Sequence, residues 1–144
     1  MSCICGTAVV GNLADSSNHL SVGTYHFVHE NKHLRAMGED QVLQMMAWDP
    51  TSDKSFVWIV DGDGKLSPAS DQESYAGFST DKTKVVQSSA TQDWTLALTQ
   101  HGGKATVLIS SADSSDQYWQ HTGERVTIGT GHTPFTVYRV GNSP

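Results

Sequence analysis

The sequence predicts an all-β domain, and three features of its pattern lead to this fold class. Apolar and polar residues alternate with a period of two along most segments, as in strands with one buried face. Clusters of Ser, Thr, Asp and Gly, which favour turns, separate these segments at roughly ten-residue spacing. No long segment keeps a convincing helical spacing of its apolar residues. The length of 144 residues fits one domain rather than two.

Four strands are expected in the first third of the chain, and a hairpin turn follows them. Tyr25 and Phe27 begin the alternation. Residues 34–48 contain many helix formers, but Gly38-Glu39-Asp40 reads as a turn, which favours two strands over one helix. Asp61-Gly62-Asp63-Gly64 is a strong hairpin signal after an apolar run. The expected strands are Thr24–His29, His33–Met37, Val42–Trp48 and Ser55–Val60.

Eight further strands are expected in the rest of the chain. Each is a short run with β-branched or aromatic residues, bounded by turn-forming residues. His101-Gly102-Gly103 is the clearest of these turns. The expected strands are Lys65–Ser67, Tyr75–Phe78, Lys84–Gln87, Asp93–Thr99, Ala105–Ile109, Gln117–Gln120, Arg125–Gly129 and Phe135–Val140.

A repeat of about 40 residues refines the fold class. Trp58, Trp94 and Phe135 lie 36 and 41 positions apart, and each closes a block of four strands. The blocks are 23–63, 64–101 and 102–140. A β-trefoil consists of three four-stranded units that share an apolar core and are related by pseudo-threefold symmetry. We therefore expect residues 23–144 to form a single β-trefoil domain.

Residues 1–22 precede the repeats and are left unassigned, either as a disordered arm or as an extra packed strand. Cys3 and Cys5 are too close together for an unstrained disulfide and lack two further ligands for zinc, so we expect both to be reduced. No secretory signal is visible after Met1. A cytoplasmic location is therefore expected.

Several short segments within residues 23–140 carry a resemblance to a known family. They are Gln92-Asp93-Trp94, Gly23-Thr24-Tyr25, Lys65–Pro68, Asp93–Leu98, Trp119, Val126–Gly129 and Phe135–Val140. With these segments the chain resembles the ricin-B-like β-trefoil lectins, and most closely the small lectins of mushrooms. The resemblance implies a defensive lectin that binds glycans, with galactose-type and fucose-containing sugars both open, and that needs no cofactor. A homodimer is left open.

The middle block contains the residue types that a sugar site needs. Sugar rings stack their C–H faces on aromatic side chains and offer hydroxyls to polar groups. The resemblance places the sugar against two segments of this block, with Phe78 as the stacking ring, Gln92 and Asp93 as hydrogen-bonding groups and Gly77 as a point of close approach. The expected carbohydrate-binding residues are Tyr75, Gly77, Phe78, Thr91, Gln92, Asp93 and Trp94.

Two other aromatic positions are secondary candidates for a sugar site. Trp48 precedes Asp49 in a polar loop of the first block. Tyr118 and Trp119 are neighbours on one strand, so their side chains should point to opposite faces. Packing in the core is the competing interpretation for Trp48, Trp119, Phe78 and Trp94.

Other classes of function have little support in the sequence. There is no Gly-x-Ser-x-Gly elbow and no phosphate-binding loop, so we do not expect an enzyme. A net charge of −6 argues against nucleic acid as a partner, and no apolar run is long enough for membrane insertion. His26, His29 and His33 are spaced so that a helix would place them on one face, but His26 and His29 lie on an expected strand, where residues three apart point to opposite faces, so a metal site is not favoured.

A β-trefoil protease inhibitor is the alternative hypothesis. Such an inhibitor presents one rigid, exposed loop to the cleft of a protease. The candidate side chains are Lys54, within residues 51–55, together with Arg35, Lys104 and Arg125. No disulfide is available to brace any of these loops.

Overall fold

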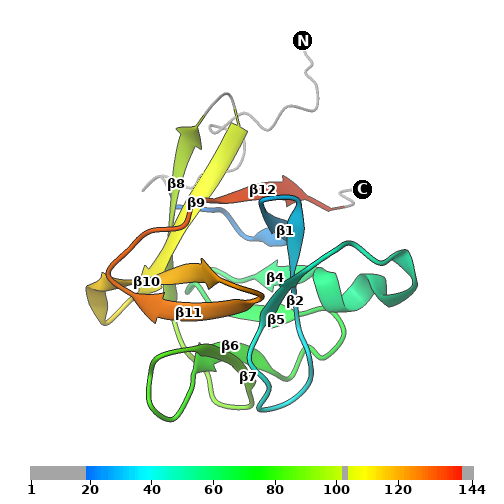
Figure 1. Cartoon of the computed structure of the whole chain (residues 1–144), viewed down its shortest axis with the longest axis horizontal. Coiled ribbons are helices and arrows are strands. Elements are labelled where there is room, and N and C mark those ends of the chain that lie inside the picture. The colour runs from blue at the N-terminus through cyan, green and yellow to red at the C-terminus, as the bar shows by residue number, and fades with distance from the viewer. Residues whose placement is uncertain (1–18, 102–103, 141–144) are drawn as a thin grey trace.

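The computed structural model describes residues 19–101 and 104–140, and within them the chain is all-β, as predicted. Twelve strands are present, one at each of the twelve expected places (Figure 1). Residues 1–18, including Cys3 and Cys5, lie outside the described residues, as does most of the expected turn at 101–103. The strands are β1 (Gly23–His29), β2 (Lys32–Arg35), β3 (Gln44–Met46), β4 (Trp58–Val60), β5 (Leu66–Pro68), β6 (Tyr75–Phe78), β7 (Val85–Ser88), β8 (Trp94–His101), β9 (Lys104–Ser111), β10 (Ser114–Thr122), β11 (Arg125–Gly129) and β12 (Phe135–Arg139).

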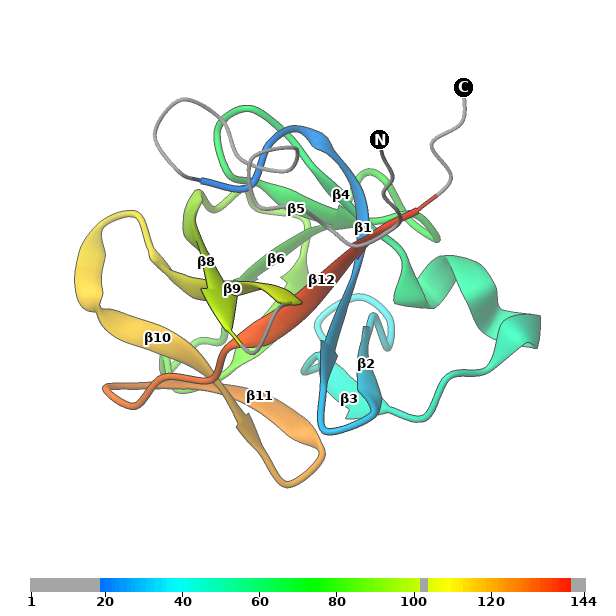
Figure 2. The ribbon, with the colours of Figure 1, turned by 90° about the horizontal axis from the view of Figure 1, so that it is seen from above.

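Seven of the strands close into a barrel. Neighbouring strands are hydrogen-bonded in the order β1, β2, β3, β11, β10, β9, β12, and β12 pairs again with β1. The last pairing is antiparallel and sets Phe27 opposite Val137. Figure 2 shows β12 next to the upper part of β1, where the two ribbons cross in this view. β4 and β5 extend the sheet from β1, β8 adds to β9, and β6 and β7 pair only with each other.

Three hairpins contact one another, namely β2–β3, β6–β7 and β10–β11, and Figure 1 shows β6–β7 at the bottom of the molecule below β10–β11. Each one is hydrogen-bonded to the other two. The Leu43 N–H donates to the Val85 carbonyl at 2.9 Å, and the Val126 N–H donates to the Leu43 carbonyl at 3.1 Å. The Ile128 N–H donates to the Thr83 carbonyl at 2.8 Å. The hairpins therefore form a cyclic arrangement in which no one of them is peripheral.

The large aromatic residues of the expected repeat all lie in the core. Trp58 and Phe135 are fully buried, and Trp94 is 3% exposed. The Trp58 indole N–H donates to the Leu34 carbonyl at 3.1 Å, and the Trp94 indole N–H donates to the Ala76 carbonyl at 2.9 Å. Each tryptophan thus ties the last strand of its block to the first strand of that block's hairpin, which satisfies a buried donor.

A 3₁₀ helix at Pro50–Phe56 corrects the expectation that the chain has no helix and that Ser55–Val60 is one continuous strand. Asp49 caps the helix, because its carboxylate accepts from the Thr51 N–H at 3.0 Å and from the Thr51 hydroxyl at 2.8 Å. These hydrogen bonds lower the pKa of Asp49. A capping Asp followed by Pro at the first helical position is a known start signal that the sequence interpretation passed over.

Residues 19–22, the end of the unassigned segment, lie against β8. The Leu20 N–H donates to the Leu96 carbonyl at 3.0 Å, and the Leu20 side chain is buried. His19 forms an isolated bridge with Ala97. This end of the segment therefore packs as an extra extended piece.

Candidate functional site

Four of the expected sugar-binding residues line one pocket of about 540 Å³, here called the Phe78 pocket. Gly77 and Phe78 come from β6, and Thr91 and Gln92 come from the loop before β8. Polar side chains complete the wall. They are Ser79, Lys82, Ser88, Ser111, Asp113 and Gln117.

Phe78 is a half-buried ring supported from behind. Its centroid lies 5.0 Å from that of Trp94, with the rings tilted by 47°. The Lys82 ammonium nitrogen lies 5.9 Å from the Phe78 centroid. The arrangement gives the pocket an apolar surface whose orientation is fixed by the core, with a cation at its edge.

The structure places the other three expected residues outside the lining of this pocket. Trp94 is buried and supports Phe78. Tyr75 is half-buried and pairs with Ser88 across the β6–β7 hairpin. The Asp93 carboxylate forms an ion pair with Lys65 at 2.8 Å, which raises the pKa of the lysine.

Part of the pocket comes from the third block, which the sequence interpretation did not include. Ser111 ends β9, and its hydroxyl accepts from the Asp113 N–H at 3.1 Å. Gln117 lies on β10 and is the third such residue. Across the pocket from the middle block, Ser88 ends β7 and its hydroxyl accepts from the Ala90 N–H at 3.1 Å. No local motif marks these residues, because only the packing of one block against the next brings them to the pocket.

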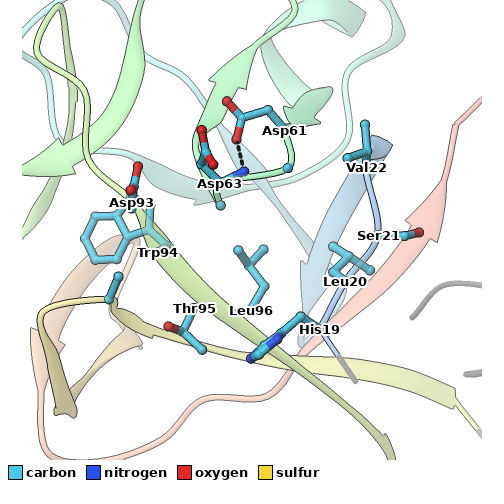
Figure 3. Close-up of a pocket in the computed structure, with 13 residues that line it drawn as sticks. His19, Leu20, Ser21, Val22, Asp61, Asp63, Asp93, Trp94, Thr95 and Leu96 are labelled. Carbon is cyan, nitrogen blue, oxygen red and sulfur yellow. Dashed lines mark hydrogen bonds between the residues drawn. The ribbon is translucent and has the colours of Figure 1, made fainter. Parts of the chain in front are cut away.

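A second pocket of about 560 Å³ lies beside the β4–β5 turn. Figure 3 shows its walls, formed by residues 19–22, 61–64 and 93–96. Asp61 accepts from the N–H groups of Asp63 and Lys65, both at 2.9 Å, so its carboxylate holds the turn. With Asp93 paired to Lys65 as well, the acidic groups of this pocket have structural partners.

Trp48, a secondary candidate, is 40% exposed and forms an aromatic cluster on the surface. Its centroid lies 5.0 Å from that of His26, 5.5 Å from that of His33 and 5.3 Å from that of Phe56. Asp49 is engaged as the helix cap. The cluster therefore offers an exposed ring, but few polar groups beside it could hydrogen-bond to a ligand.

Tyr118 and Trp119 face opposite sides of β10, as expected. Trp119 is fully buried, with its ring 5.2 Å from that of Trp94, and it belongs to the core. Tyr118 is half-buried, and its ring packs against that of His132 with centroids 4.1 Å apart and the planes tilted by 51°. Of this pair only Tyr118 can reach a ligand.

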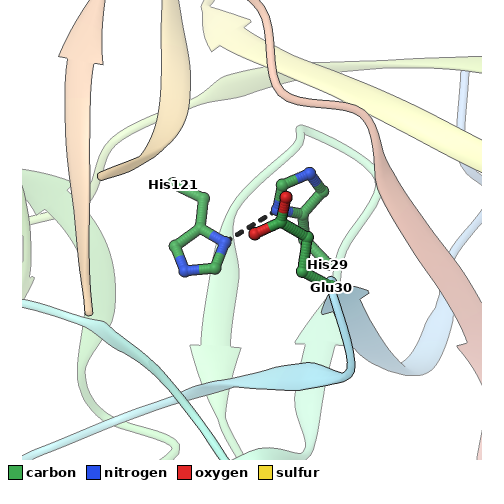
Figure 4. Close-up of side chains that lie close together, drawn as sticks. All are labelled: His29, Glu30 and His121. Carbon is green, nitrogen blue, oxygen red and sulfur yellow. Dashed lines mark hydrogen bonds between the residues drawn. The ribbon is translucent and has the colours of Figure 1, made fainter. Parts of the chain in front are cut away.

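Four of the seven histidines form two separate pairs that the chain spacing does not reveal. His26 and His33 pack edge to face with centroids 5.5 Å apart, beneath Trp48. His29 instead faces His121, with their Nδ1 atoms 2.7 Å apart, and Glu30 lies beside them (Figure 4). His29 and His121 are 92 positions apart, so no sequence motif could have joined them.

Comparison of the chain with protein-family models and with curated proteins gives no match. Within residues 19–101 and 104–140, no helix has the length and apolar character needed to cross a membrane.

Proposed function

We propose that the protein is a carbohydrate-binding protein and that the Phe78 pocket holds the sugar. The observation that carries this proposal is a half-buried aromatic ring that packs on Trp94 and has hydroxyl, amide and carboxylate side chains around it. A sugar presents C–H groups on its faces and hydroxyls at its edges. The Phe78 ring suits the first, and Gln92, Asp113 and Gln117 suit the second.

The fold behind this proposal is a β-trefoil of the ricin-B-like type. Three features support it: the similar spacing of Trp58, Trp94 and Phe135, the cyclic contact of three hairpins, and the equivalent indole hydrogen bonds of the two tryptophans. The resemblance to mushroom lectins extends the proposal to a cytoplasmic, defensive protein whose glycans contain galactose-type or fucose units.

The preferred site is the Phe78 pocket rather than the Trp48 cluster, because polar donors and acceptors surround only the Phe78 ring on several sides. Shallow sugar sites bind weakly one at a time, so several sites or a homodimer would raise the overall avidity.

A glycan array probed with the labelled full chain tests the proposal. The wild type should bind a subset of glycans, and Phe78→Ala should weaken that binding at least tenfold, a loss of about 1.4 kcal/mol. Because Phe78 also packs on Trp94, Gln92→Ala serves as a second variant. The Gln92 side chain donates only to the adjacent Asp93 carbonyl, so little of the fold depends on it. Tyr138→Ala, which removes a 45% exposed ring on β12, is the matched control and should bind normally.

Protease inhibition is the outcome that would replace this proposal. Lys54, the main candidate contact for a protease, lies in the 3₁₀ helix rather than in an extended loop, which favours the lectin over the inhibitor. An array without any bound glycan, together with tight inhibition of trypsin or of a cysteine protease, would reverse that preference. Glycan binding that survives Phe78→Ala and Gln92→Ala but is lost in Trp48→Ala would place the site at the Trp48 cluster.

A further inference from the structure

Three possible metal ligands come together where the first and third blocks meet, and they are His29, Glu30 and His121. His29 ends β1, Glu30 follows it in the turn, and His121 lies near the end of β10. One ligand atom from each of the three residues lies within 4.8 Å of the others. Figure 4 shows the Glu30 carboxylate beside the line that joins the two imidazole rings.

The two imidazoles face each other through their Nδ1 atoms, which are 2.7 Å apart. With both rings neutral, only one of the two nitrogens can carry a hydrogen there, and the other must present a lone pair. A neutral imidazole nitrogen is the form that binds a metal ion.

The surroundings fix both rings. His29 packs edge-on against the buried Phe135, with centroids 6.2 Å apart. The His121 backbone N–H donates to the Thr133 hydroxyl at 3.1 Å. Both histidines are half-buried, so a bound ion would be partly shielded from water while Glu30 remains exposed.

The turn that carries Glu30 has an unusual backbone. Glu30 and Asn31 have φ values of +54° and +66°, the left-handed region. Asn adopts this region readily, but Glu does so at a cost of about 1–3 kcal/mol. Gly or Asn would suit position 30 better, and the carboxylate at this position lies next to the two imidazoles.

We propose that His29, Glu30 and His121 form a binding site for Zn²⁺. Two imidazole nitrogens and one carboxylate are a ligand set that zinc accepts, with water as the fourth ligand. In a tetrahedral site the two nitrogens would lie about 3.3 Å apart, so the rings must separate by roughly 0.6 Å. The hydrogen that the two Nδ1 atoms share moves to the Nε2 atom of the same ring, and both Nδ1 lone pairs then face the ion.

The bound ion would join β1 to β10, two strands of the closed barrel from the first and third blocks. It would bind the folded chain far better than the unfolded one, because only folding brings residues 29 and 121 together. Zinc should therefore raise the melting temperature in proportion to the logarithm of its concentration above Kd. This site lies apart from the Phe78 pocket, so the proposal does not depend on sugar binding.

Isothermal titration of the metal-free full chain with ZnCl₂, paired with thermal unfolding, tests the site. We expect one ion per chain and a rise in melting temperature. His121→Ala should weaken zinc binding by more than the ~10–100-fold typical of residues that only support a ligand, and it should abolish the thermal shift. Glu30→Gln, an exposed change that leaves the fold intact, should weaken binding to a smaller extent. His132→Ala, at an exposed histidine, is the matched control and should bind like the wild type.

Cys3 and Cys5 offer zinc a competing place, so the double variant Cys3→Ser/Cys5→Ser belongs in the same series. The proposal requires this variant to keep its zinc and its thermal shift. Full affinity in His121→Ala, or loss of binding in the cysteine variant alone, would overturn it. Absence of any zinc binding by the wild type would leave the 2.7 Å contact as a hydrogen bond between two histidines and would equally overturn it.

Discussion

Gly64 lies where the β4–β5 turn meets the first residue of β8, and we expect Gly64→Ala to weaken this junction. The Gly64 φ is +89°, and a Cβ atom there would collide with the Trp94 carbonyl oxygen. The Gly64 carbonyl also accepts from the Trp94 N–H at 3.0 Å. A side chain at position 64 must therefore strain the backbone and push the turn away from β8.

The size of the effect follows from these contacts. A positive φ in a residue other than glycine costs about 1–2 kcal/mol. Loss of the hydrogen bond adds about 0.5–1.5 kcal/mol. The reduced freedom of the unfolded chain returns about 0.4–1 kcal/mol. The free energy of unfolding should fall by about 2 kcal/mol, which for a chain of this length lowers the melting temperature by roughly 8 °C.

Thermal unfolding followed by circular dichroism measures this difference. Gly62→Ala is the matched control in the same turn, because its Cβ would meet only a methyl group of Val22, at 3.9 Å, and its φ is not positive. The control should stay within about 0.5 kcal/mol of the wild type. Equal melting temperatures for the two variants would refute the argument from close approach.

Two further predictions concern the core and the response to pH. Trp94→Phe removes the donor to the Ala76 carbonyl and should lower the free energy of unfolding, measured in urea, by about 2 kcal/mol. Trp48→Phe at the surface is the control and should change this free energy by less than about 0.5 kcal/mol. Equal effects of the two substitutions would contradict the role given to the buried indole. Burial, and then the neighbouring His26, lowers the pKa of His33. As the pH falls, His33 therefore becomes protonated in the unfolded chain at a higher pH than in the folded chain. The stabilisation that neutral His33 contributes is full above the ordinary histidine pKa and is lost as the pH falls below it. The melting temperature should therefore fall when the pH is lowered from about 7 to about 5. His33→Gln should reduce that drop, and an unchanged drop would exclude His33 as its source.

The sequence predicted the strands well, because alternation and turn residues are local signals. Each of the twelve strands appears within a few residues of its expected place. The 3₁₀ helix at Pro50–Phe56 was missed, since a helix of seven residues is too short to show periodicity and only the Asp49–Pro50 cap indicates its start. The trefoil itself stays a prediction, supported by the cyclic hairpins.

The candidate site was predictable only in part. Gly77, Phe78, Thr91 and Gln92 lie on neighbouring segments of one block, and the pocket brings them together. Trp94 is buried in the core instead, where its indole N–H donates to the Ala76 carbonyl and its ring supports Phe78. Residues of the third block, and the pairing of His29 with His121, depend on how the blocks pack, which local patterns do not encode.

The pairing of β1 with β12 also has a consequence for synthesis of the protein. The Arg139 guanidinium donates to the Tyr25 hydroxyl at 2.8 Å across 114 positions of the chain. During translation β1 leaves the ribosome well before β12, so this pairing cannot form until all the residues between the two strands have been synthesised. Until then one edge of β1 is open to strands of other chains, so the rate of elongation and the concentration of nascent chains should influence the yield of folded protein.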